Sequence, residues 1–179
     1  MKGVEVNTFD LTIPSDEKIT VTMDLLGFGG SQSQTTLDAS PNAAPGNEIM
    51  TGSCNVAKIF EGGSALSTAN AVTNFTLNIN NNLREQRAIG DKELIGIGTG
   101  TSEVTGTADM FFGDNTIYQK YVNGTFTSFV VVAVGGLSKN TNGEGGYVYY
   151  TPCVKYTAAP IDIPGLDSDV TISGSFTAV

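Results

Sequence analysis

Apolar and polar side chains alternate with a period of two along most of this 179-residue chain. In segment 19–25 the apolar residues occupy the odd positions, and in segment 74–80 they alternate with asparagine and threonine. Successive side chains of a β-strand point to opposite faces, so each segment predicts a strand with one apolar and one hydrated face. The alternation therefore indicates a β protein.

Further strands are predicted where β-branched and aromatic residues gather. A weaker strand is predicted at 4–13, where the apolar register changes between Val6 and Phe9, and this change indicates a bulge or short break near Asn7. The loop 135–146 joins two of the segments, which predicts a long antiparallel hairpin. The stronger segments are 104–112, 125–134, 147–156 and 170–179, and a second weak one is 54–60.

One helix is predicted over 114–122, with Asp114 or Asn115 as its cap and Gly124 close to its end. Nearby aromatic residues are interpreted as core between this helix and the sheet. They are Phe111, Phe112, Tyr118 and Tyr121.

Length and composition predict a single domain spanning 1–179. Within it, segment 27–47 is too long and too poor in apolar residues for a hairpin turn, so it is either mobile or ordered by a partner. The first eleven residues include Glu5 and Asp10, where a signal peptide needs an apolar run. The chain is therefore expected to be made and kept in a cytosol-like compartment.

Composition excludes several kinds of catalytic and metal site. The chain has no histidine and two cysteines, so it lacks the residues for a Ser-His-Asp group, a histidine metal site or a four-cysteine zinc site. Cys54 and Cys153 lie far apart in sequence and are interpreted as buried free thiols. No catalytic, cofactor-binding or metal-binding residue is predicted.

Two short motifs are weak evidence for ligand sites. The run 96–101 resembles a phosphate loop, but no Gly-Lys-Ser/Thr follows it. The stretches that begin at Asn140 and Asp162 lack the Gly and Glu spacing of a calcium loop. Paired carboxylates for glycoside hydrolysis depend on separation in space, so the sequence leaves them open without pointing to them.

Charge argues against a DNA-binding protein, because nine basic and eighteen acidic residues give a net charge of −9. Arg84, Arg87 and Lys92 lie in a short stretch with Glu85, Asp91 and Glu93, where the opposite charges cancel. The stretch predicts ion pairs, either within the chain or between subunits.

A series of distinctive motifs follows in order over about a hundred residues. They are FTLNINNNLREQRAIGD at 75–91, IGIGTG at 95–100, EVTGTADMFFGD at 103–114, IYQKYVNGT at 117–125, YVYYTPCVKYT at 147–157 and LDSDVTISGSFTA at 166–178. In sequence and in order these motifs resemble the tail tube (major tail) protein family of long-tailed bacteriophages.

The resemblance implies an all-β, mainly antiparallel sandwich or barrel with one short flanking helix, similar to the type VI secretion tube protein. It implies hexameric rings that stack into the virion tail tube, made in the cytoplasm of the host bacterium. DNA passes through the tube without specific binding, and no reaction is catalysed. The implied partners are the tape-measure protein and the tail terminator and distal tail proteins.

The NLREQRAIG stretch is the family-like element that an isolated fold least requires, so Arg84, Glu85 and Arg87 are expected to be intersubunit contacts. Six copies at −9 each carry −54, which favours sliding of DNA over adhesion. Family members often carry a longer stretch before the segment that corresponds to Val4, so the chain is expected to be a short member or a fragment.

The alternative interpretation is a monomeric β-sandwich that acts as a binding or adhesion module of a virion. Such a module predicts a protein that stays monomeric and carries an exposed aromatic patch. The absence of tryptophan argues against it, since flat aromatic platforms are often built on that residue.

Overall fold

A single antiparallel sheet of ten strands dominates the computed structural model, which describes residues 2–32, 34–35, 40–41, 43, 49–66, 70–134 and 145–179. The strands follow the order β2-β1-β5-β8-β12-β10-β9-β3-β4, and β11 pairs with β12. Their bounds are β1 Lys2–Pro14, β2 Thr20–Gly29, β3 Val56–Glu61, β4 Ser64–Ala65, β5 Val72–Asn80, β8 Glu103–Phe111, β9 Phe126–Val134, β10 Gly146–Ala158, β11 Ile161–Asp162 and β12 Thr171–Ala178.

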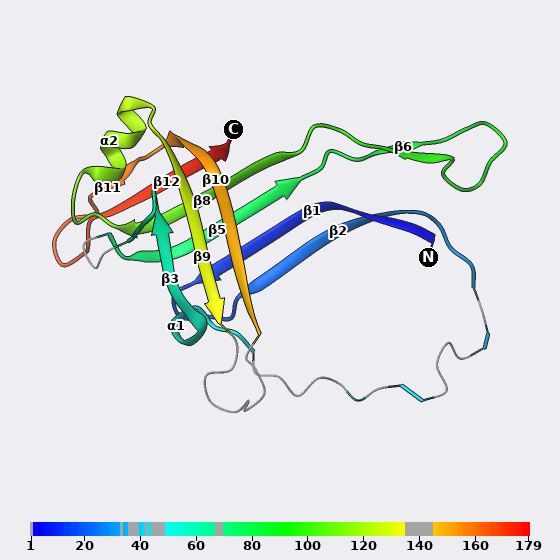
Figure 1. Ribbon diagram of the computed structural model, residues 1–179, viewed down its shortest axis with the longest axis horizontal. Coiled ribbons are helices and arrows are strands. Elements are labelled where there is room, and N and C mark those ends of the chain that lie inside the picture. Colours follow the sequence, from blue (N-terminus) through cyan, green and yellow to red (C-terminus); the bar gives the residue numbers. More distant parts are fainter. Residues whose placement is uncertain are drawn as a thin grey trace.

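Four smaller elements complete the described part of the chain. Strands β6 (Arg84–Gln86) and β7 (Gly96–Gly98) form a separate antiparallel pair, and the helices are α1 (Gly52–Asn55) and α2 (Thr116–Asn123). The pair belongs to a ribbon, residues 81–102, that projects beyond β5 and β8 (Figure 1). This ribbon is called the arm.

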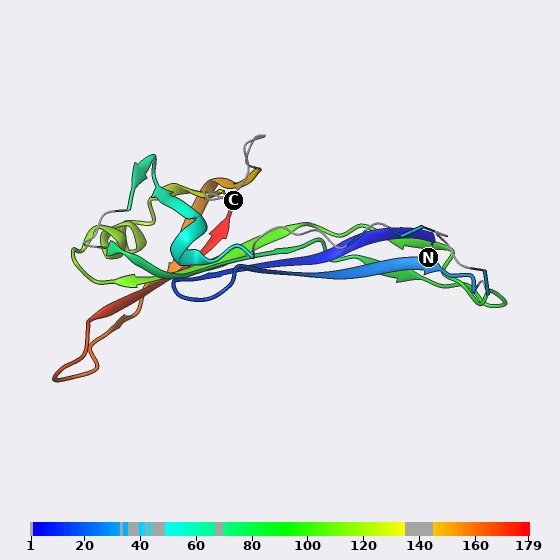
Figure 2. The ribbon, with the colours of Figure 1, turned by 90° about the horizontal axis from the view of Figure 1, so that it is seen from below.

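The sheet folds over itself into two layers. Strands β3, β9 and β10 cross β1, β5 and β8 steeply, and they lie on one side of a long, flat layer (Figures 1 and 2). The layers meet face to face, since the ring centroids of Phe75 on β5 and Phe129 on β9 are 5.6 Å apart. Phe176 on β12 lies 4.7 Å from Phe129. Burial of each such ring stabilises the fold by about 2 to 3 kcal/mol.

Two glycines allow this close packing. A Cβ on Gly106 would lie 2.4 Å from both the Phe176 ring and the Thr76 carbonyl oxygen, and one on Gly174 would lie 2.8 Å from the Tyr156 ring. Both positions therefore require the absence of a side chain.

The structure confirms the mainly antiparallel β-fold and the predicted strands at 104–112, 125–134, 147–156 and 170–179. The predicted hairpin is also confirmed, because Val131 of β9 pairs with Tyr149 of β10. The loop prediction at 135–146 falls largely outside the described residues, and about half of the segment 27–47 does so; Gly29 ends β2 and Gly146 begins β10.

The bulge predicted near Asn7 is confirmed. Val6 pairs with Leu25, but Thr8 pairs with Asp24, so the register of β1 shifts by one residue at Asn7. The shift returns the valines before the bulge to the face that carries Phe9. One face of β1 is thus apolar on both sides of the bulge.

The predicted helix at 114–122 is confirmed as α2, with Asn115 at its N-terminal cap. Gly124 ends it in the left-handed region, with φ 61°, and its N–H group donates to the Lys120 and Tyr121 carbonyls.

The aromatic cluster around this helix was placed wrongly in the core. Ile117 is the buried residue of α2, whereas Tyr118 and Tyr121 are exposed and contact each other. Phe111 is also exposed, and Phe112 alone of the four packs against the core. The helix is short and buries only one position, so its i, i+4 pairs do not mark a broad buried face.

The strand prediction at 54–60 is wrong at its start, because α1 continues to Asn55 and β3 begins at Val56. Thr51 and Asn55 close this helical turn, with the Thr51 N–H donating to Asn55 Oδ1 at 2.7 Å and the Asn55 N–H donating to the Thr51 carbonyl at 3.0 Å. Cys54 and Cys153 are both free, but Cys54 is exposed and Cys153 is half-buried, which corrects the prediction of two buried thiols.

Candidate assembly surfaces

The outward side of the flat layer is a continuous polar surface, called the polar face. Its residues lie opposite one another on successive strands, which places them on the same side of the sheet. From β2 to β12 one row reads Thr20, Thr12, Thr76, Thr107 and Ser175, and the next reads Thr22, Asp10, Asn78, Thr105 and Thr177.

Side-chain hydrogen bonds run across the strands of this face. Asp109 accepts from Asn74 Nδ2 at 3.2 Å and from Ser173 Oγ at 2.5 Å, and the Asn78 amide donates to Asp10. Thr76 and Thr107 share a hydroxyl contact of 2.7 Å. Amide and hydroxyl donors therefore point along the sheet toward carboxylates and away from solvent.

The charged side chains of the polar face are acidic. Glu103 lies opposite Asn80, and Asp24 lies opposite Thr8 and accepts a hydrogen bond from Asn7 Nδ2 at 3.3 Å. The sequences of β2, β5, β8 and β12 contain no lysine or arginine. This surface has a trace in the sequence, since asparagine, threonine and aspartate occupy alternate positions along consecutive strands. The strand order was needed to show that these positions form one face.

The opposite side of β1 and β2 is an exposed apolar surface. Beyond the second layer these strands run on uncovered (Figure 2), and Met23 and Leu25 are 51% and 53% exposed. The pairs Leu11↔Val21, Phe9↔Met23 and Val6↔Leu25 place these side chains on one face, together with Val4. This surface, called the apolar shelf, is formed by Val4, Val6, Val21, Met23 and Leu25. An exposed apolar patch of this kind is typical of interaction sites.

The arm carries the three residues singled out from the sequence. Arg87 Nη2 lies 2.6 Å from Glu85 Oε2, so these two form an ion pair within the chain. Arg84 points elsewhere, and its Nη2 donates to the Thr99 carbonyl at 3.4 Å. At the tip of the arm Ile89 is fully exposed. The structure thus joins Glu85 to Arg87 and leaves Arg84 without a carboxylate partner in the described part of the chain.

Two tyrosine hydroxyl groups have raised pKa values because of where they lie in the fold. Burial raises the pKa of the Tyr156 hydroxyl, and the negative charge of Glu61 raises it further. Burial also raises the pKa of Tyr149, with a further contribution from Tyr147.

Across the described residues, no group of three or more acidic or cysteine side chains is arranged to hold a metal ion. No described helix is long and apolar enough to cross a membrane.

Comparison with known proteins shows the family of the chain. The family model described as phage tail tube protein matches residues 1–178, and it confirms the resemblance carried by the motifs. No curated protein matches the chain. The match covers nearly the whole length of the chain, and the fold is the β-rich one that the family requires. The chain therefore belongs to the phage tail tube protein family, and is a structural, non-enzymatic component of the virion tail that assembles into a tube.

Proposed function

We propose that six copies of this chain close into a ring whose bore is lined by the polar face, and that rings stack into a conduit for DNA during ejection. The observation that carries the proposal is the extent of this face, which continues over the five strands β2-β1-β5-β8-β12. A lone domain has no need of so broad and flat a hydrated surface.

The dimensions of the sheet agree with a ring of six. Strands in a sheet lie about 4.8 Å apart, so four or five strands from each of six copies form a barrel roughly 35 to 45 Å across. Side chains take up about 5 Å on each side, which leaves a bore of roughly 25 to 35 Å. A DNA duplex passes through such a bore, whereas three copies would leave too little room.

The chemistry of the polar face suits a moving polyanion. Proteins grip DNA mainly through lysine and arginine contacts to phosphates, and most of the strands that form this face lack both residues. The carboxylates of Asp10 and Asp109 repel phosphates, and they also engage amide and hydroxyl donors that would otherwise bind phosphate oxygens. The face therefore offers a passing duplex few attachment points.

The apolar shelf and the arm are proposed as contacts between copies. The shelf exposes apolar side chains that a neighbouring subunit would bury, and charged residues are depleted from the cores of such interfaces. Arg84, Glu85 and Arg87 are proposed as intersubunit contacts on the arm. These exposed surfaces also argue against the alternative, a binding module that stays monomeric.

The resemblance supports the proposed partners. The tape-measure protein would occupy the bore before DNA and meet the same polar face. The terminator and distal tail proteins would bind the two ends of the tube. These contacts use the exposed surfaces described above and require no further site.

Negative-stain electron microscopy of the purified chain over a concentration series, with light scattering for mass, tests the proposal. We expect rings or tubes with sixfold end-on views above a threshold concentration. Rings of another symmetry would overturn the hexamer, and a monomer at every concentration would overturn assembly by this chain alone.

A further inference from the structure

The two ends of the long axis carry complementary features. At one end lies the loop between β11 and β12, residues 163–170, called the end loop, and at the other end lies the arm (Figures 1 and 2). Leu166 in the end loop is 97% exposed, and Ile163 is 73% exposed. Large apolar side chains so far from the core contribute little to the stability of a single chain.

The backbone of the end loop holds Leu166 in place. Gly165 before it has φ 111° and Asp167 after it has φ 65°, so both neighbours adopt left-handed conformations. A residue other than glycine costs about 1 kcal/mol or more in that region. Gly165 adopts this region without that cost, so Asp167 alone carries it, beside an exposed leucine.

The end loop is also acidic. Asp162, Asp167 and Asp169 lie in it or beside it, and the sequence contains no lysine or arginine from residue 156 to the last residue, 179. A surface that receives this loop therefore needs an apolar recess with a cation at its rim.

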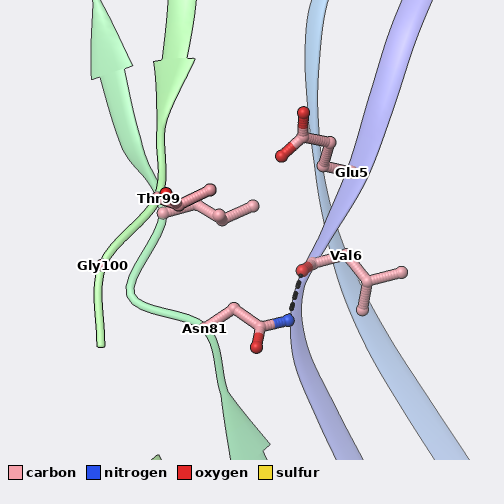
Figure 3. A pocket seen from close by; sticks show the side chains of 6 residues that line it. Glu5, Val6, Asn81, Thr99 and Gly100 are labelled. Atoms are coloured by element: carbon pink, nitrogen blue, oxygen red, sulfur yellow. Dashed lines mark hydrogen bonds between the residues drawn. The ribbon is translucent and has the colours of Figure 1, made fainter. Parts of the chain in front are cut away.

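A groove with an apolar recess, formed by Val6 and Leu83, lies between β1 and the base of the arm, and the Glu5 carboxylate also lines it. It has a volume of about 350 Å³ and is lined by Glu5, Val6, Asn81, Leu83, Thr99 and Gly100 (Figure 3). Asn81 Nδ2 donates to the Val6 carbonyl at 2.9 Å and ties the two sides of the groove together.

Arg84 supplies the cation. It follows Leu83 in the chain, and its guanidinium reaches the Thr99 carbonyl, so its charge lies beside the groove. Within the described ranges no carboxylate lies within ion-pair distance of Arg84, whereas Arg87 is already paired with Glu85.

We propose that the end loop of one copy docks into this groove on a second copy, with Leu166 in the recess and the loop carboxylates paired with Arg84. Because the two surfaces lie at opposite ends of the molecule, the contact is head to tail and can repeat from copy to copy. The inference rests on the proposed assembly, and it specifies which surfaces meet.

Cysteine cross-linking tests the contact directly. In a background with Cys54→Ser and Cys153→Ser, Leu166→Cys protein is mixed with Leu83→Cys protein, assembled, and treated with a short bis-maleimide. We expect a covalent dimer in the mixture and in neither protein alone. Ile49→Cys, at an exposed site that belongs to neither the groove lining nor the end loop, replaces Leu83→Cys as the control. Equal cross-linking to the control, or none in assembled tubes, would overturn the contact.

Assembly of charge variants provides the second test. We expect Leu166→Asp to raise the threshold concentration at least tenfold, whereas Ser168→Asp, with the same added charge in the same loop, changes it less than threefold. Arg84→Glu should weaken assembly, and Asp169→Lys should restore it in part. Thermal unfolding of each monomer establishes that the variants fold.

These results separate the two hypotheses. Tubes that form normally with Leu166→Asp and give no cross-link would overturn the docking contact and leave the proposed function intact. A wild-type chain that never assembles would overturn both.

Discussion

Lys120 of α2 and Glu61 of β3 form an ion pair between the helix and the sheet. The Glu61 side chain is 4% exposed and that of Lys120 is 24% exposed. Thr127 Oγ1 on β9 donates to the second Glu61 oxygen at 2.5 Å. The carboxylate is thus enclosed by two partners, and the pair fixes α2 to the second layer.

Lys120→Met is expected to destabilise the chain by about 3 kcal/mol, because it leaves a buried carboxylate without its cation. Urea unfolding measures the change. Lys58→Met, which removes an exposed lysine, is the control and should change stability by less than about 0.5 kcal/mol. Equal effects of the two substitutions would show that the pair contributes nothing specific.

Gly106→Ala is expected to destabilise the chain by about 2 kcal/mol or more, since the new methyl group overlaps backbone and an aromatic ring. Gly30→Ala is the matched control, because no atom of the described residues, apart from its chain neighbours, lies within 4 Å of its added Cβ. The same urea titration compares them. An unchanged midpoint for Gly106→Ala would mean that the two layers are packed less tightly than described.

Met23→Glu is expected to block assembly while leaving the monomer folded, because it places a charge in the apolar shelf. Thr22→Glu adds the same charge to the opposite face of the same strand and should leave assembly nearly unchanged. Sedimentation of assembled material and circular dichroism of the monomer separate the two effects. Tubes formed by Met23→Glu at the normal concentration would exclude the shelf from the interface.

Glu103→Lys is expected to make assembled tubes retain DNA, because it introduces a phosphate-binding cation on the polar face. Retention of a short fluorescent duplex in sedimented tubes should appear at low salt and disappear as salt rises. Asp16→Lys, at an exposed loop position, makes the same charge change off the polar face and is the control. Equal retention of the duplex by both variants would show that the polar face does not line the bore.

The pKa of Asp114 is lowered from 3.8 by hydrogen bonds from Thr116 and then from Asn70. A carboxyl group with a lowered folded pKa stabilises the fold above its unfolded pKa, and this stabilisation is lost as pH falls through the folded value. Asp114→Asn should therefore lower the melting temperature at pH 6, and the difference from wild type should shrink below pH 4. A difference that grows in acid would contradict this assignment.

Alternation and turn chemistry predicted much of the fold. The strand segments, the bulge at Asn7 and the helix end at Gly124 all follow from local rules that the final structure obeys. The α1 turn was missed, because it depends on hydrogen bonds between Thr51 and Asn55 that the alternation of apolar and polar residues does not reveal.

The candidate surfaces were harder to predict than the strands. The pattern at 19–25 identifies an apolar face, but it cannot say whether the same chain covers it, and β2 leaves Met23 and Leu25 exposed. The polar face likewise emerged only when the register aligned Asp10 with Asn78 and Thr105. Surfaces made by several strands depend on topology, which local patterns do not encode.

The extra residue at Asn7 keeps the apolar side chains of β1 on one face of the sheet. If it were removed, Val4 and Val6 would turn toward the polar face and Glu5 would turn toward the apolar shelf, so a single deletion would exchange the two faces of β1 before the bulge. Substitutions at position 7 preserve which side chains face each side of the sheet, whereas insertions and deletions there do not. The spacing across the bulge is therefore under tighter constraint than the identity of its residues, and variation among tail tubes of this kind should accumulate as substitutions and spare the number of residues between Val6 and Phe9.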